Sequence, residues 1–424
     1  MSSLVLIFLA ILGACALAVA AGGTRWSLSP RGLLKQCTRV FVTPVLAWVY
    51  RADAEDVERR TRAYWVGRDA TPAGPASESW KRVRLQHPGL TVHGSDPLPW
   101  PRQSIPFVYE VPDRDFLRGL RARYRLDEIV GAALEEYPAM LRLGAWLGTR
   151  WDHGVDKVPG SHLLCDPIAV IAAGEQGSKY WCEIAAKTTV QAASALGWHA
   201  RLVTASRDGY TWEHAVAELW SNQFAKWFVM DTDFNVVFEN EGVPLSAFEL
   251  AHQGERLRDE GKLTVRPIAS AKPSLPLIDL MPFYRYVHVD LRNDWCSRRL
   301  RRGSPMGGDR ATWWTKRSTM RPVLTAKIRV DSAERFDWKV NAVAIHTIAA
   351  QRRPEGLLLE IALETYSPQF TCFEVGVDSA AYQRIAGARY SIAISAGEHT
   401  IRARVVTSGG YPGPVSLLRL RLHE

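Results

Sequence analysis

Three stretches decide the fold of this chain: CEIAAKTTVQAASALGWHARLV at residues 182–203, EHAVAELW at residues 213–220 and KWFVMDTDFN at residues 226–235. In the first stretch, small and apolar residues recur every three or four positions, which predicts a buried helix. Ser178 is placed to cap this helix, and Gly197 is placed to end it. Alternation of residue character then predicts strands at 200–205, 213–220 and 226–231.

One cysteine stands near the start of the predicted helix. Cys182 falls in its first turns, where the positive end of the helix dipole favours a thiolate, the nucleophilic form of the side chain. The chain has six cysteines, and their spacing suggests neither metal ligands nor a disulfide scaffold. We therefore expect free thiols, with Cys182 as a candidate nucleophile.

A histidine and an aspartate lie on matching faces of the next two strands. If His214 lies opposite Asp231, the strands are joined by a four-residue loop at 221–224, a common hairpin length. Opposed residues have Cβ atoms about 5 Å apart, so Asp231 could hold one imidazole nitrogen while the other faces Cys182. An alternative is that Asp231 is a turn residue and Asp233 takes its role.

These motifs resemble the core of the transglutaminase-like superfamily, whose fold is similar to that of papain-like cysteine proteases. In that family a helix opens with Cys, and Leu-Gly-x-x-Ala-Arg, His-Ala-x-x-Glu and Trp-x-x-x-Asp follow. The resemblance implies that Cys182 is the nucleophile, His214 the general base and acid, and Asp231 the residue that orients the histidine. For the oxyanion it implies the backbone N–H of Cys182, with Trp181 and Tyr180 as candidates for a second donor.

Two positions depart from the family pattern. Trp181 stands where relatives often carry Gly or Gln before the cysteine. His199 stands where relatives commonly carry Pro, and we do not assign it to catalysis. The calcium-loop signature is missing from the sequence, and we expect neither a metal nor another cofactor.

The expected reaction is attack of a thiolate on an amide carbonyl to give a thioester, which water or an amine then resolves. Hydrolysis is favoured because water is always present. The chain also resembles bacterial transglutaminase-like proteins of cell-surface or polysaccharide systems, so the expected substrate is a protein, a peptide or a cell-envelope polymer. Two alternatives stay open: a non-catalytic scaffold with this fold, and a basic membrane-surface adaptor that uses the arginines between Arg298 and Arg302.

The overall prediction is an α+β fold with a transglutaminase-like (papain-like) core, an N-terminal membrane helix and a C-terminal antiparallel β-sandwich. The predicted parts are an anchor or signal sequence at 1–22, a membrane-proximal linker at 23–110, the catalytic domain at 111–265, a basic connection containing Pro and Trp at 266–322, and the sandwich at 323–424. Helices are expected at 114–124 and 127–143. Strands in the sandwich are expected at 324–330, 338–343, 357–365, 370–377, 390–395, 400–406 and 416–422.

The N-terminus is apolar and uncharged from residue 4 to residue 21. An uncleaved single-pass anchor is favoured over a cleaved signal peptide, because no Lys or Arg precedes Arg25. The basic residues after it favour a cytoplasmic catalytic domain by the positive-inside rule. The net charge is +9, but the sequence shows no nucleic-acid-binding motif, so a nucleic-acid partner is not expected.

Overall fold

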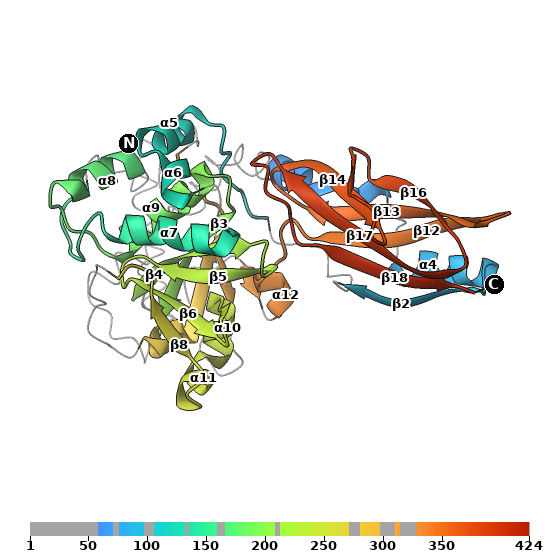
Figure 1. Cartoon of the computed structure of the whole chain (residues 1–424). Coiled ribbons are helices and arrows are strands. Elements are labelled where there is room, and N and C mark those ends of the chain that lie inside the picture. Colours follow the sequence, from blue (N-terminus) through green and yellow to red (C-terminus); the bar gives the residue numbers. More distant parts are fainter. Residues whose placement is uncertain are drawn as a thin grey trace, which may run out of the picture.

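The computed structural model describes residues 58–70, 76–96, 106–131, 135–158, 166–207, 213–270, 280–296, 310–313, 328–330 and 332–423. Within these ranges the protein is a mixed α and β fold with largely antiparallel sheets, as the α+β prediction requires (Figure 1). The predicted membrane helix at 1–22 and the basic residues between Arg298 and Arg302 lie outside the described residues. No helix of the described part is long and apolar enough to cross a membrane.

The predicted cysteine helix is present as α9, Cys182–Ala195. Gly197 ends it with a left-handed φ of 87°. The amide of Trp198 donates to the carbonyl of Ala193, and the amide of Gly197 donates to that of Ser194, which is a Schellman ending. The predicted cap is wrong, because Trp181 is the N-cap and the Ser178 amide donates to Ala173 in the preceding turn.

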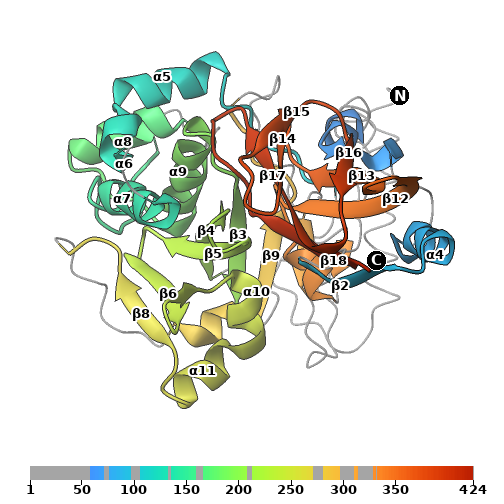
Figure 2. The same ribbon diagram turned by 45° about the vertical axis from the view of Figure 1, so that its right-hand side comes forward.

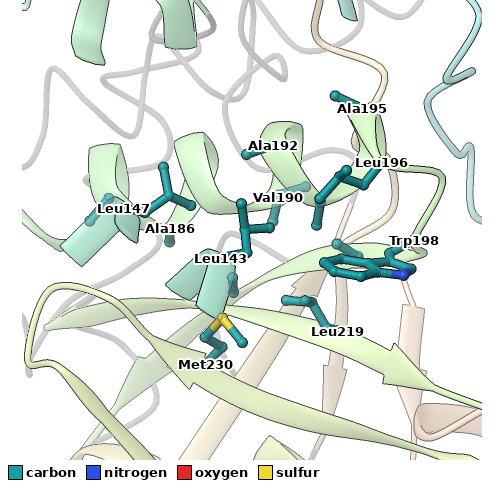
Figure 3. Close-up of a cluster of buried hydrophobic side chains, with 14 of the residues drawn as sticks. Leu143, Leu147, Ala186, Val190, Ala192, Ala195, Leu196, Trp198, Leu219 and Met230 are labelled. Atoms are coloured by element: carbon teal, nitrogen blue, oxygen red, sulfur yellow. The ribbon is translucent and has the colours of Figure 1, made fainter. Parts of the chain in front are cut away.

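The sheet beneath α9, here called the core sheet, has nine strands in the order β11-β10-β9-β3-β4-β5-β6-β7, with β8 also paired to β6. Their bounds are β3 Ala200–Ser206, β4 His214–Ser221, β5 Lys226–Asp231, β6 Val236–Asn240, β7 Val243–Pro244, β8 Thr264–Pro267, β9 Tyr286–Asp290, β10 Arg310–Trp313 and β11 Ile328–Val330. Val190 of α9 lies above Leu219 of β4 and Met230 of β5 in the buried cluster of Figure 3. This apolar contact fixes the helix across the sheet.

The hairpin between β4 and β5 has a different register from the predicted one. Trp220 pairs with Trp227, so the loop comprises residues 222–225 instead of 221–224. Ala225 takes a left-handed φ of 53°, which suits a turn and not the strand position that the predicted register gave it. The offset is two residues, so every side chain keeps its predicted face of the sheet.

Helices cover both sides of the core sheet (Figure 2). On the α9 side lie α5 (Asp115–Arg123), α6 (Leu126–Val130), α7 (Glu136–Gly148) and α8 (Pro167–Glu175). The other side carries α10 (Ala247–Glu249), the π-helix η2 (Leu250–Gly254), α11 (Glu255–Asp259) and the 3-10 helix η3 (Met281–Arg285). The single helix predicted at 127–143 is wrong, because Gly131 caps α6 with a φ of 75° and a new helix starts at Glu136.

A second body is a β-sandwich of a four-stranded and a five-stranded sheet, here called the sandwich. Its strands are β1 Trp65–Val66, β2 Leu90–Asp96, β12 Val343–Arg353, β13 Gly356–Tyr366, β14 Phe370–Val377, β15 Gln383–Ile385, β16 Arg389–Ile394, β17 Gly397–Thr407 and β18 Ser416–Leu422. Five of the seven predicted strands are confirmed. The one predicted at 338–343 instead begins at Val343, and residues 328–330 of the first predicted strand belong to the core sheet.

Two predicted connections are structured parts of these bodies. Within the predicted linker at 23–110, β1 pairs with β13 and β2 pairs with β18, while α4 (Ala76–Gln86) packs against the sandwich core through Val83 (Figure 1). Within the predicted connection at 266–322, β9 pairs with β3 in the core sheet. The short 3-10 helix η1 (Arg68–Ala70) follows β1 in the chain, and α12 (Ala333–Phe336) lies between β11 and β12. The sandwich is therefore built from both ends of the described chain.

Candidate active site

The candidate nucleophile occupies the first position of α9. Trp181, the N-cap, is extended with φ −92° and ψ 171°, and the helical conformation starts at Cys182. The N–H groups of the first helical turn have no partner within their own helix, so they face the end where the thiol sits. Cys182 is a half-buried free thiol that packs against the core beneath α9. A negative charge at this end of the helix is favoured.

His214 and Asp231 form the expected pair at neighbouring ends of β4 and β5. Nε2 of His214 lies 2.7 Å from Oδ2 of Asp231, and both side chains are buried. The other carboxylate oxygen accepts from the amides of Asp233 at 3.1 Å and Phe234 at 2.9 Å. With both oxygens held, the carboxylate fixes the imidazole in one orientation. Asp231 therefore makes the contact with His214 that the predicted orienting residue would use, and the recorded partner of Asp233 is His153.

Cys182 lies next to the imidazole of His214. Its Sγ, a ring nitrogen of His214 and a carboxylate oxygen of Asp233 all lie within 4.8 Å of one another. Since Nε2 is engaged by Asp231, Nδ1 is the nitrogen left for the thiol. Burial alone would lower the pKa of His214, but Asp231 and then Cys182 outweigh it and raise this pKa to about 10. The protonated ring favours a thiolate beside it.

Aromatic rings enclose the imidazole. Phe234 stacks on His214 with ring centroids 4.2 Å apart and planes 7° from parallel. Phe283 and Tyr284 of η3 approach the ring at 5.9 Å and 6.5 Å. Burial and then the charges of Asp231 and other neighbours raise the pKa of the Tyr284 hydroxyl well above its usual value, so it stays protonated. These rings exclude water from the base and make its contact with Asp231 stronger.

A second His–Asp pair flanks the site, and its histidine is not among the residues that the sequence predicts for the site. Nδ1 of His153 lies 2.9 Å from Oδ2 of Asp233; the His153 side chain is 43% exposed and that of Asp233 only 1%. Burial and then the nearby charge of Asp231 raise the pKa of Asp233, against the opposing effect of His153. Nothing in the spacing of His153 from the triad marks it as a site residue.

The two candidates for the second oxyanion donor differ in their positions. The backbone N–H of Tyr180 donates to the carbonyl of Asp152 at 3.0 Å, so this N–H of Tyr180 is already engaged. Its carbonyl accepts from the amide of Gly154, which fixes the segment before α9. Trp181 is the residue adjoining the nucleophile and is half-buried. The N–H of Cys182 thus remains the expected first donor, with Trp181 as the candidate beside it.

The other motif residues form a buried support below the site. Arg201 of β3 is fully buried and pairs with Glu218 of β4 at 2.6 Å and with Asp337 at 2.8 Å. Its guanidinium lies 4.3 Å and 4.5 Å from the rings of Trp227 and Trp338. The Arg, Glu and Trp of the sequence motifs therefore meet in one cation–π and ion-pair cluster, which ties β3, β4 and β5 together.

The carbonyl of His199 accepts from the amide of Trp220, near the end of β4 opposite to His214. His199 is 3% exposed and contacts Tyr109 edge-on at 5.2 Å. Burial lowers its pKa to about 4. A neutral, enclosed imidazole of this kind is a packing residue.

Searches against protein-family models and against curated proteins find no match to this chain.

Proposed function

We propose that this protein is a transglutaminase-like cysteine hydrolase or acyltransferase that cleaves an amide bond through a thioester on Cys182. The observation that carries the proposal is the buried His214, whose Nε2 lies 2.7 Å from Asp231 and which has a ring nitrogen within 4.8 Å of the Cys182 thiol. A nucleophile, a base and an orienting group in this order meet the requirements of covalent acyl transfer. The proposed substrate is a protein, a peptide or a cell-envelope polymer.

The steps follow from the positions of these groups. The Cys182 thiolate attacks the amide carbon, a C–S bond forms, and the oxyanion is stabilised by the N–H at the start of α9. His214 gives its Nδ1 proton to the departing amine, the C–N bond breaks, and a thioester remains. Neutral His214 then takes a proton from water or from a second amine as that group attacks the thioester. The products are an acid or a new amide, and the free thiolate returns.

Support for an anchored enzyme comes from the sequence alone. The apolar segment at residues 1–22 is proposed to hold the chain at a membrane by a single pass. Its basic flank favours the cytoplasmic side for the catalytic domain.

The test compares the full-length chain with Cys182→Ala on a peptide library, with and without an added amine, and identifies products by mass spectrometry. The parent is expected to release acids without amine and to form new amides with it. Cys372→Ala is the matched control, because Cys372 is a half-buried free thiol on β14 of the sandwich. The proposal fails if Cys182→Ala gives the same products as the parent.

A further inference from the structure

Asp233 is a buried carboxylate that the proposed acyl transfer does not use. It lies two residues after the orienting Asp231 and is 1% exposed. One of its oxygens is within 4.8 Å of both Cys182 Sγ and a ring nitrogen of His214. In the described part of the chain this is the one place where three such donors gather. A sulfur, a nitrogen and an oxygen therefore converge on one point beside the nucleophile.

We propose that Cys182, His214 and Asp233 bind Zn²⁺ or a similar thiophilic divalent cation, and that this cation switches the nucleophile off. Thiolate, imidazole and carboxylate are the three donor types that zinc takes in proteins, at about 2.0–2.3 Å from the metal. Donors at those distances in a tetrahedron lie about 3.6 Å from each other. The three donor atoms lie within 4.8 Å of one another in this structure, so small side-chain movements toward a shared centre would bring them to these distances.

The contacts around these donors are those that metal ligands need. His214 uses Nε2 for Asp231, which leaves Nδ1 free to bind a cation. Nδ1 of His153 lies 3.0 Å and 2.9 Å from the two carboxylate oxygens of Asp233, which orients the carboxylate. A histidine ligand backed by a carboxylate, and a carboxylate ligand backed by a donor, are typical outer contacts of zinc sites.

The charges and exposure also suit a divalent cation. When the cation binds, the imidazolium of His214 gives its Nδ1 proton to solvent. The resulting thiolate, carboxylate and neutral imidazole carry two negative charges, which a divalent cation balances. Cys182 is half-buried and the His153 side chain is 43% exposed, so the group is reached from that side. Three protein donors leave a fourth position for water, as in open zinc sites. Mg²⁺ and Ca²⁺ prefer oxygen donors and do not fit this set.

The consequence for activity rests on the proposed function, whereas the binding itself does not. A bound cation takes the electron pair of the Cys182 thiolate and the nitrogen that His214 uses for proton transfer. The thiolate can then neither attack a carbonyl nor react with an alkylating reagent. Removal of the cation restores both groups.

The test measures Zn²⁺ affinity of the tag-free full-length chain in detergent, by competition with a chromogenic chelator. Cys182→Ser and the isosteric Asp233→Asn are each expected to weaken binding by about 100-fold or more, since even outer-contact changes cost 10–100-fold. Cys372→Ser is the matched control and keeps the parental affinity. With Co²⁺ in place of Zn²⁺, the parent is expected to show a thiolate-to-cobalt charge-transfer band, and Cys182→Ser is expected to lose it. Circular dichroism shows whether each variant keeps the fold.

The outcomes separate this inference from the proposed reaction. If folded Cys182→Ser and Asp233→Asn bind Zn²⁺ as tightly as the parent, the metal site is refuted, whatever the peptide products show. If both substitutions weaken binding while Cys182→Ala leaves the peptide products unchanged, the metal site stands and the acyl transfer fails. Mg²⁺ at the same concentration is expected to leave iodoacetamide labelling of Cys182 unchanged, whereas Zn²⁺ suppresses it.

Discussion

Replacing Asp231 by Asn tests the ion pair at the centre of the site. Nε2 of His214 lies 2.7 Å from the carboxylate, and the pKa of the imidazole rises from the usual 6.5 to about 10. That rise corresponds to roughly 5 kcal/mol in favour of the protonated ring. An opposite charge at this range accounts for about 1–3 pKa units, so we expect Asp231→Asn to remove about 3 kcal/mol of it. The imidazolium–thiolate pair should then be about 100-fold less favoured.

The assay is the rate of iodoacetamide labelling at pH 6, followed by mass spectrometry of the peptide that holds Cys182. An ordinary thiol is less than about 1% ionised at this pH, so rapid labelling reports the ion pair. Asp231→Asn is expected to label one to two orders of magnitude more slowly than the parent. Asp378→Asn is the matched control, because it removes a 2.9 Å contact to His399 in the sandwich. Equal rates for Asp231→Asn and the parent would refute the ion pair.

Three further changes test the support of the site and the fold. Arg201→Met leaves the buried carboxylate of Glu218 and the part-buried carboxylate of Asp337 without their cation and is expected to lower the free energy of unfolding by about 3–5 kcal/mol in urea titrations; an unchanged midpoint contradicts the cluster. Gly356→Ala would put a Cβ 2.1 Å from a backbone oxygen at a φ of 147°, so the melting temperature of the sandwich should fall, whereas Gly387→Ala meets open space. Burial lowers the pKa of His199 to about 4, so the unfolded chain binds more protons between pH 6.5 and 4 and this residue costs up to about 3 kcal/mol as the pH falls through that range. His199→Phe should flatten the dependence of stability on pH there, and an unchanged slope counts against a neutral buried ring.

Local periodicity was enough to predict the elements that carry the site. The helix that opens at Cys182 and the strands that carry His214 and Asp231 each depend on spacing within a few residues. The two faces were therefore predicted correctly even though the register was not. The register depends on the left-handed turn at Ala225, for which alanine gives no signal.

Contacts between distant segments could not be predicted in the same way. His153 and Asp233 are 80 positions apart, and no periodic pattern relates them. Thr91 of β2 bonds to the carbonyl of Arg421 on β18, which is 330 positions away. Alternation shows that a strand has two faces, but it does not name the strand that pairs with it. For that reason the sequence predicts a linker where β1 and β2 of the sandwich lie.

Because β1 and β2 belong to the sandwich, the direction of synthesis determines when each body of the protein can fold. A ribosome delivers these strands first and β12–β18 last, with the whole core sheet synthesised between them. The nascent core can therefore fold while the sandwich still lacks most of its strands. β2 can pair with β18 only after β18, the last strand, has been synthesised. Expressing the last hundred residues alone would expose the edge of β18 that β2 normally covers, an open template for aggregation.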